Sequence, residues 1–425
     1  MQPIPIDRRR LDNGLRVILS RDERAPVVAV NLWYGVGTKH EKPGKTGFAH
    51  LFEHMMFQGS ANVEKGEHFK YIHGAGGTVD ATTDLDRTNY SETLPRQELE
   101  LALWLEADRM SSLLSAMTQQ KLDNQREVVK NERRWAVDNQ PYGTYDEKLQ
   151  ELVFPERHPY HHSVLGSMED LEAASLEDVS QFFATFYCPN NAVLSIVGDF
   201  ESDAAMAMIE RQFGPIAANP DFPAPPNMDL DPFLLGRQIR LVVPDRVSLL
   251  RIYLAYRIPG YGTPEFDALE VAADLLGTGR GSLLYGSLVR ASQVAQDVEG
   301  YPFPLIGGGS ILAVWATARP GIEAKRLEDG MQEEIARLRE DGPSDDALER
   351  VRNLHDARTV ASLEHASERA DRLSMYTTLF DQPQRINDET SRYSAVPAAD
   401  VREALAAYVR PDNQVVLTYM PLEGV

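Results

Sequence analysis

An internal repeat is the feature of this chain that most limits how it can fold. Residues 47–59 have a counterpart at residues 265–277, with apolar residues or glycine in matching places. The matching pairs are Phe48 with Phe266, Leu51 with Leu269, Phe57 with Leu275 and Gly59 with Gly277. A segment that occurs twice in this way predicts two homologous halves.

Strand-like segments accompany both copies of the repeat. In residues 27–34, every second side chain is apolar, as expected of a strand. Similar segments precede the second copy, and a short apolar stretch follows a Pro-Asn or Pro-Asp turn near the end of each half. The predicted strands are 15–20, 27–34 and 193–197 in the first half, and 239–243, 249–256 and 415–419 in the second.

A proline-rich stretch separates the two halves. Residues 213–233 contain six prolines, a composition typical of an extended linker. We therefore predict an α+β fold of two homologous α/β-sandwich halves, each a mostly antiparallel sheet with helices packed on it. The predicted boundaries are an N-terminal domain at 1–213, a linker at 214–235 and a homologous C-terminal domain at 236–425, each domain being of ordinary size.

The first copy of the repeat alone contains the pattern His50-Leu51-Phe52-Glu53-His54. Residues four apart share a face of a helix, so both imidazoles can approach one point, with Glu53 beside them. Two neutral imidazoles and a carboxylate are the ligands and base of a hydrolytic zinc site. The order is the inverse of the commoner His-Glu-x-x-His arrangement.

The second copy shows that this helix does not need polar side chains in order to fold. It has Ala268, Val271 and Ala272 where the first copy has its two histidines and Glu53. Polar side chains at positions that can be packed cost desolvation free energy unless they are occupied. The alternative, that these histidines are ordinary core or surface residues, is weakened accordingly.

A third ligand is needed for a hydrolytic zinc site, which has three protein ligands and an open position. The helix-like stretch 123–136 offers Glu127 and Glu132. Sequence spacing does not select Glu132 over Glu127, Glu106 or Asp108, and a glutamate on a charged helix is usually solvated.

Residues around the motif also match those of a known enzyme family. The matches are Gly35, Val36, Gly37, Glu41, Gly44, Gly47, Gly59, Gly76, Gly77, Ala81, Thr82, Asp86, Thr88, Tyr90, Glu127, Val128, Val129 and Glu132, with the motif and Met55, Met56 and Phe57. On these residues, the chain resembles the inverzincin peptidases of family M16, the group of pitrilysin, insulin-degrading enzyme and mitochondrial processing peptidase. In having two homologous halves joined by a linker, the chain is similar to the smaller members of this family.

The resemblance implies the chemistry of the site. His50, His54 and Glu132 would bind one Zn²⁺ per chain, and Glu53 would be the general base that takes a proton from water and later delivers it to the leaving amine. The family often has a second Glu seven residues before the third ligand, where this chain has Gln125. We expect that change to tune activity and not to abolish it.

The resemblance also implies where a substrate binds. Residues 74–83 are a glycine-rich turn followed by a β-prone segment. In the related peptidases the equivalent strand is an exposed sheet edge onto which the substrate adds, so Ala81 and Thr82 are candidate substrate-binding residues. An ordinary hairpin is the alternative.

The C-terminal half departs from the family pattern. Members that work alone or as identical pairs carry an Arg and a Tyr seven residues apart, which steady the substrate carbonyl. Arg290 matches and is a candidate substrate-binding residue, but, with one missing residue allowed, Gln296 stands where the Tyr is expected. We therefore expect a homologous partner subunit that supplies an Arg/Tyr pair in a heterodimer, with a homodimer as the second choice.

Composition limits the remaining possibilities. No run approaches the ~20 apolar residues of a membrane span. The formal net charge of −21 argues against nucleic acid as a partner. Cys188 is the single cysteine and the first residues lack a leader pattern, so we expect a cytoplasmic protein, or a periplasmic one if a leader has been removed.

The expected function is that of a zinc-dependent endopeptidase that cleaves short or unfolded peptides. A non-catalytic scaffold of the same fold, such as a core subunit of a respiratory complex, is the alternative, and the intact ligand set disfavours it. A hydrolase that acts on something other than peptides is disfavoured by the resemblance alone.

Overall fold

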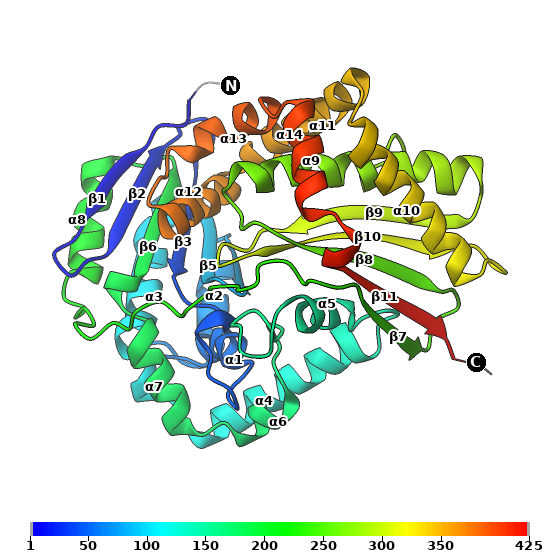
Figure 1. Ribbon diagram of the computed structural model, residues 1–425. Helices are drawn as coiled ribbons and strands as arrows, with labels where there is room; N and C mark the ends of the chain where they lie inside the picture. Colours follow the sequence, from blue (N-terminus) through cyan, green and yellow to red (C-terminus); the bar gives the residue numbers. More distant parts are fainter. Residues whose placement is uncertain (1–2, 423–425) are drawn as a thin grey trace. The chain divides into compact units, whose positions relative to one another are not determined.

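The computed structural model describes residues 3–422 and contains two β-sheets with helices packed on them (Figure 1). The first sheet has the strand order β1-β2-β6-β3-β5-β4, and the second has the order β7-β11-β8-β10-β9. Among the described strands, β2–β6 and β7–β11 pair in parallel and the other pairs are antiparallel. The predicted α+β fold with mostly antiparallel sheets is confirmed.

The six predicted strands are all present, with ends that differ by up to two residues. The strands of the first sheet are β1 (Asp7–Arg10), β2 (Arg16–Arg21), β3 (Val27–Tyr34), β4 (Thr78–Thr83), β5 (Thr88–Pro95) and β6 (Ala192–Gly198). The strands of the second sheet are β7 (Ile239–Asp245), β8 (Arg251–Ile258), β9 (Ala295–Phe303), β10 (Ser310–Ala318) and β11 (Gln414–Pro421). The order β2-β6-β3-β5-β4 is repeated as β7-β11-β8-β10-β9, so the sequence repeat is also a repeat of topology.

Helices follow the strands in both parts of the chain. Those before the proline-rich stretch are α1 (Phe48–Met55), α2 (Glu67–Gly74), α3 (Leu99–Ser112), α4 (Gln119–Arg133), α5 (Tyr145–Val153), α6 (Met168–Ala173), α7 (Leu176–Phe186) and α8 (Ser202–Phe213). Those after it are α9 (Pro264–Gly277), α10 (Ala324–Asp341), α11 (Asp345–Leu363), α12 (Ala366–Phe380), α13 (Arg385–Ser394) and α14 (Ala398–Tyr408). Residues 214–238 form neither helix nor strand. None of the described helices has the length and hydropathy of a membrane-spanning segment.

The chain forms two compact units that do not follow the predicted boundaries. The first unit comprises residues up to 133, 163–226 and 358–389, and the second comprises 134–162, 227–357 and 390 onward. Helix α12 therefore belongs to the first unit although it follows the linker, and α5 belongs to the second although it precedes it. The division at 1–213, 214–235 and 236–425 stays a prediction about the homologous halves, which are distinct from these compact units.

Strand β3 explains why α12 belongs to the first unit. Its residues Val28, Val30, Leu32 and Tyr34 face the core that contains α1, as the alternating pattern predicts. The other face of the strand is also buried, because Ala29 and Trp33 pack with Leu373 and Tyr376 of α12. The first sheet is thus covered on both faces, and a segment from the far end of the chain supplies the second cover.

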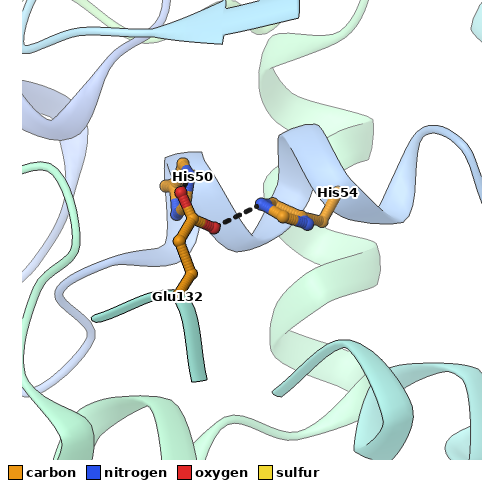
Figure 2. A group of neighbouring side chains, drawn as sticks. All are labelled: His50, His54 and Glu132. Carbon is orange, nitrogen blue, oxygen red and sulfur yellow. Dashed lines mark ion pairs between the residues drawn. The ribbon is translucent and has the colours of Figure 1, made fainter. Parts of the chain in front are cut away.

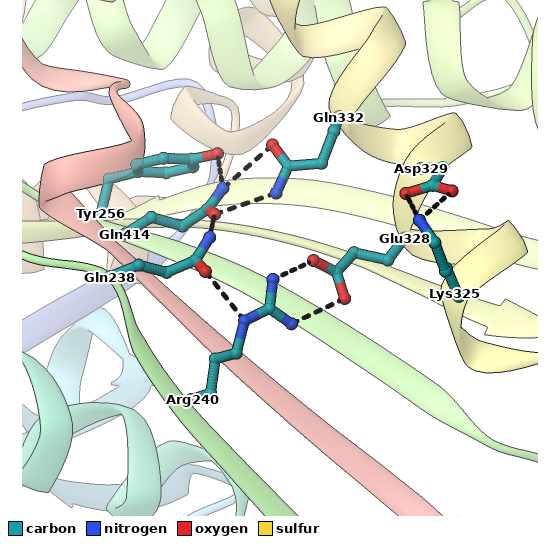
Figure 3. A network of polar contacts seen from close by, with 8 residues as sticks. All are labelled: Gln238, Arg240, Tyr256, Lys325, Glu328, Asp329, Gln332 and Gln414. Atoms are coloured by element: carbon teal, nitrogen blue, oxygen red, sulfur yellow. Dashed lines mark hydrogen bonds and ion pairs between the residues drawn. The ribbon is translucent and has the colours of Figure 1, made fainter.

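A ladder of polar side chains joins α10 to the second sheet (Figure 3). Gln414 of β11 is buried, and its side-chain oxygen accepts hydrogen bonds from Gln238 at 2.6 Å and Gln332 at 2.9 Å. Its amide nitrogen donates to the hydroxyl of Tyr256. At the exposed end of this group of side chains, the guanidinium of Arg240 forms a bidentate ion pair with Glu328 of α10. The buried amide is therefore satisfied on both sides, as a polar group inside a protein requires.

Candidate metal centre

Helix α1 presents the motif histidines because its start is fixed by a neighbouring carboxylate. Glu41 accepts hydrogen bonds from the backbone N–H groups of Gly47 at 2.8 Å and Ala49 at 2.7 Å, which would otherwise be unsatisfied at the helix N-terminus. Gly47 has a φ of 83°, and a Cβ there would lie 2.5 Å from the carbonyl oxygen of Leu165. A glycine is therefore required where the chain turns into the helix.

Helix α4 brings Glu132 to the two imidazoles. Its buried residues Leu122, Gln125 and Val129 lie at helical spacing, and Glu132 continues the same face. The carboxylate of Glu132 lies 3.1 Å from Nε2 of His54 and 3.6 Å from Nε2 of His50 (Figure 2). One donor atom from each of these three residues lies within 4.8 Å of the others.

The other third-ligand candidates have different partners. Glu127 is exposed and pairs with Lys130 at 3.1 Å. Asp108 accepts hydrogen bonds from Ser60 and Asn62. Glu106 is buried beside a guanidinium on its own helix. Of the four carboxylates that sequence spacing left open, the structure places Glu132 at the histidines.

The electrostatics of the trio keep the His50 imidazole neutral and the Glu132 carboxylate ionised. Burial and, to a smaller extent, the neighbouring His54 lower the pKa of His50 to about 4, so the His50 imidazole is neutral near pH 7. Burial pulls the pKa of His54 down, but its hydrogen bond with Glu132 and the charge of that carboxylate outweigh burial and raise it. The hydrogen bond with His54 in turn lowers the pKa of Glu132 against the effect of burial.

The donor set fits Zn²⁺. At 3.6 Å, Nε2 of His50 is too far from Glu132 for a hydrogen bond, and its Nδ1 is buried without a hydrogen-bond partner among the described residues. Two imidazole nitrogens and one carboxylate oxygen are a ligand set that leaves a catalytic zinc ion an open position for water. A cation among the three would meet Nε2 of His50, which faces Glu132 without a hydrogen bond to it.

Glu53 lies on α1 beside the trio and is held by a residue that the sequence did not single out. The hydroxyl of Thr83 in β4 donates a hydrogen bond of 2.5 Å to the Glu53 carboxylate. Burial raises the pKa of Glu53, while the hydrogen bond from Thr83 and the charge of His54 lower it. The strand pattern could have found Thr83, because it lies two residues after Ala81 and therefore on the same face of the strand.

Gln125 lies next to a predicted ligand. Its side chain is buried on α4 and hydrogen-bonds with His54, which contributes to the raised pKa of that histidine. The residue that replaces the family glutamate is therefore in direct contact with the candidate centre.

Strand β4 is an edge of the first sheet, as the resemblance to the related peptidases implied. Ala81 packs on the core that contains α1. Thr82 is exposed on the opposite face, where its hydroxyl hydrogen-bonds with Asn89 and contacts Arg87. The roles of Ala81 and Thr82 in substrate binding stay predictions, and of the two only Ala81 has its side chain on the face of the metal helix.

Arg290 belongs to the second compact unit. It lies in a π-helix, Tyr285–Ala291, and its guanidinium donates to the carbonyl of Arg280 at 3.2 Å. Gln296 is exposed on β9, and Tyr301 lies further along the same strand. The role predicted for Arg290 stays a prediction.

A second group of potential ligands is already occupied by a side chain. His68, Glu92 and Glu106 have donor atoms close enough to hold a metal ion and are all buried. The guanidinium of Arg109 lies among them, with its Nε 2.9 Å from Glu106 and another nitrogen 3.8 Å from Glu92. Because a buried cation already pairs with these carboxylates, we interpret the group as a charged core network and not as a metal centre.

Known proteins resemble this chain over nearly its full length. The family description "Insulinase (Peptidase family M16)" matches residues 16–159, and "Peptidase M16 inactive domain" matches residues 173–354. The Zinc protease PqqE of Helicobacter pylori is 26% identical over 97% of this chain and 92% of that protein. A probable mitochondrial-processing peptidase subunit beta of Arabidopsis thaliana is 21% identical over 98% of this chain and 78% of that protein. The crystal structure of a protease from Helicobacter pylori has a TM-score of 0.90 at 26% identity and covers 99% of this chain and 100% of that chain.

Proposed function

This chain belongs to peptidase family M16, as its sequence indicated, and from that premise we propose that it is a zinc-dependent endopeptidase. The observation that carries the proposal is the meeting of His50, His54 and Glu132, with Glu53 on the same helix as the two histidines. The name Zinc protease PqqE, given to a relative of similar length, supports the same activity.

Each residue of the site has a role in the proposed reaction. His50, His54 and Glu132 would hold Zn²⁺, which when bound would polarise the scissile carbonyl and make water more acidic. Glu53 accepts the proton of the attacking water and later delivers it to the nitrogen of the leaving amine. Its raised pKa suits a group that must both take and return a proton near neutral pH.

Strand β4 provides a place for the peptide. As an edge strand, it has backbone N–H and C=O groups that can pair with an extended segment. A folded protein cannot offer such a segment without local unfolding, so the proposed substrates are short or unfolded peptides. Main-chain pairing of this kind tolerates many sequences, because side chains contribute only at their own pockets.

A homologous partner subunit is part of the proposal. The second half carries Arg290, but Gln296 stands at the position of the expected tyrosine. A relative is named as a subunit beta, which is consistent with a subunit that acts within an assembly. We therefore favour a heterodimer in which the partner supplies an Arg/Tyr pair, with a homodimer as the second candidate.

A non-catalytic scaffold is the second candidate function. The description "Peptidase M16 inactive domain" for residues 173–354 favours it for that part of the chain. The residues proposed for zinc binding and catalysis lie outside that range, at positions 50, 53, 54 and 132. The two candidates differ in whether the zinc-loaded chain hydrolyses peptides.

The test is to measure zinc content and cleavage of a quenched peptide library by the purified chain, alone and mixed with a homologous subunit carrying Arg and Tyr. We expect one tightly bound zinc per chain and cleavage that a chelator abolishes. Glu53→Gln should keep the zinc and lower turnover by at least about a hundredfold. Wild-type turnover in that variant would show that Glu53 is not the base, and zinc binding without any cleavage in the mixture would favour the scaffold.

A further inference from the structure

Strand β4 presents the backbone N–H group of Ala81 at the free edge of the sheet. Ala81 lies opposite Tyr90 of β5, and the hairpin below them has a hydrogen bond of 2.9 Å from Asp84 N to Arg87 O. Hydrogen-bonded and non-hydrogen-bonded pairs alternate along an antiparallel ladder, which makes Ala81 and Tyr90 a non-hydrogen-bonded pair. The N–H and C=O groups of Ala81 therefore point away from β5, toward the free edge of the sheet.

This N–H group is covered by the preceding side chain. Asp80 Oδ1 accepts a hydrogen bond of 2.9 Å from the backbone nitrogen of Ala81. The Asp80 side chain is exposed, and no cation pairs with it in the part of the chain that the structure describes. The nearby guanidinium of Arg87 is bonded instead to the Thr82 carbonyl at 2.8 Å and to Asn89 at 2.9 Å. A carboxylate without a counter-ion thus stands at the edge where a peptide would add.

A peptide strand that pairs with β4 has to compete with this carboxylate. Its carbonyl must take over the N–H of Ala81, and Asp80 then loses a charge-assisted hydrogen bond. A lysine or arginine side chain of the peptide can compensate the displaced carboxylate, whereas a neutral or acidic side chain cannot. The cost of binding therefore depends on the charge of one peptide residue.

We propose that Asp80 is a specificity-determining residue that selects peptides with a basic side chain next to the residue paired with Ala81. This inference rests on the proposed function, because it assumes that peptides add to β4. The negative formal charge of the chain acts in the same direction at long range, but it cannot favour one position of the peptide over another.

A protective role of Asp80 has a different consequence. Exposed charges on edge strands also prevent the edges of two sheets from pairing. That role does not depend on which side chains a peptide carries. A position-dependent preference for lysine therefore separates specificity from protection of the edge.

The test uses the full-length, zinc-loaded chain with Glu53→Gln, so that bound peptides stay intact. Fluorescein-labelled nonapeptides carry lysine, glutamine or glutamate at one central position at a time, and fluorescence anisotropy gives each Kd. We expect lysine to bind about threefold to fivefold more tightly than glutamine at one position, the range of an exposed ion pair, with the preference falling as salt is added. Asp80→Asn keeps an acceptor for Ala81 and should reduce that ratio to about one.

Two further variants make the result decisive. Asp80→Lys should reverse the preference, so that the glutamate peptide binds more tightly than the lysine peptide. Asp221→Asn removes the same charge from an exposed site in the proline-rich stretch and should leave the ratio unchanged. The proposal is overturned by an unchanged ratio in Asp80→Asn, by an equal loss in Asp221→Asn, or by a chain that binds none of the peptides. If selective binding is observed but the chain with its native Glu53 cleaves nothing, the peptidase function fails while the role of Asp80 stands.

Discussion

At the scale of single residues, Glu132 is the clearest case of what three-dimensional structure adds. Its sequence surroundings are those of a solvated helix, and spacing left it equal to three other carboxylates. The structure places it 3.1 Å from His54, while Glu127, five residues earlier on the same helix, pairs with a lysine. Two glutamates of one helix thus provide a matched pair for mutagenesis.

We expect Glu132→Gln to weaken zinc binding by more than about a hundredfold, because even residues that only orient metal ligands contribute tenfold to a hundredfold. Glu127→Gln is the control and should bind zinc like the wild type. A competition titration with a zinc chelator measures both. Equal affinities of the two variants would remove Glu132 from the ligand set.

Thr83 is expected to position the base. The hydroxyl of Thr83 lies 2.5 Å from the carboxylate of Glu53 and 3.5 Å from the hydroxyl of Thr88, so its proton goes to the closer and charged acceptor, Glu53. Thr83→Val should lower kcat by about tenfold to a hundredfold, the range of a hydrogen bond to a charged group, and leave KM and zinc content unchanged. Thr83→Ser, which keeps the hydroxyl, should restore most of kcat. A parallel loss of zinc in Thr83→Val would point to a structural role instead.

His68 is expected to make the protein sensitive to acid. Burial and the charge of Arg109 together lower the pKa of His68 to about 3, so below pH 6.5 the unfolded chain binds a proton that the folded chain does not bind. The stability from this histidine is complete above pH 6.5 and is lost as the pH falls toward 3, by about 2 kcal/mol between pH 7 and pH 5.

The check is urea unfolding of the wild type and His68→Gln at pH 7 and pH 5. The glutamine can still donate to Glu92, which the histidine contacts at 3.2 Å, but it does not titrate. The variant should therefore lose less stability on acidification than the wild type. Burial is the largest cause of the raised pKa values of Glu92 and Glu106, and this cause is present in both proteins and cancels in the difference. An equal loss in the two proteins would contradict the prediction.

At the scale of elements, local patterns gave the strands but not the faces that they bury. The alternation in residues 27–34 predicted β3 with its observed ends, Val27–Tyr34. It did not reveal that Ala29 and Trp33 are as buried as Val28 and Leu32, because the covering helix comes from another part of the sequence. Alternation is a signal of one buried face, and a strand that is buried on both faces partly hides it.

The polar ladder beneath α10 should behave differently at its two ends. Gln414→Leu removes the acceptor of Gln238 and Gln332 inside the second unit and should lower the free energy of unfolding by about 2 kcal/mol. Arg240→Ala removes an ion pair whose arginine side chain is 53% exposed, and it should change stability by less than about 1 kcal/mol. Denaturant unfolding compares the two variants, and equal effects would show that burial does not set the cost in this ladder.

At the scale of the whole molecule, the repeat predicted two related sheets. It did not predict that a helix after the linker belongs to the first compact unit and a helix before the linker to the second. Helix α12 covers the first sheet although it follows the linker in sequence. We therefore expect the fragment 1–235, the predicted N-terminal domain with its linker, to expose the face of β3 and β6 that α12 buries. It should bind a hydrophobic dye and unfold without a cooperative transition. A fragment with cooperative unfolding and no dye binding would show that 1–213 folds as an independent domain.

The sequence by itself determined the family, the α+β class, the paired halves and the candidate group of His50, Glu53 and His54. These depend on local spacing, because residues four apart share a helix face whatever surrounds the helix. Tertiary structure decided which acidic residue meets the imidazoles, that Thr83 holds Glu53, that Asp80 covers the edge of β4 and that α12 belongs to the first unit. Each of these depends on how distant segments pack or on how a strand pairs with its neighbour. The periodicity of a sequence carries no information about which distant segment a side chain will contact.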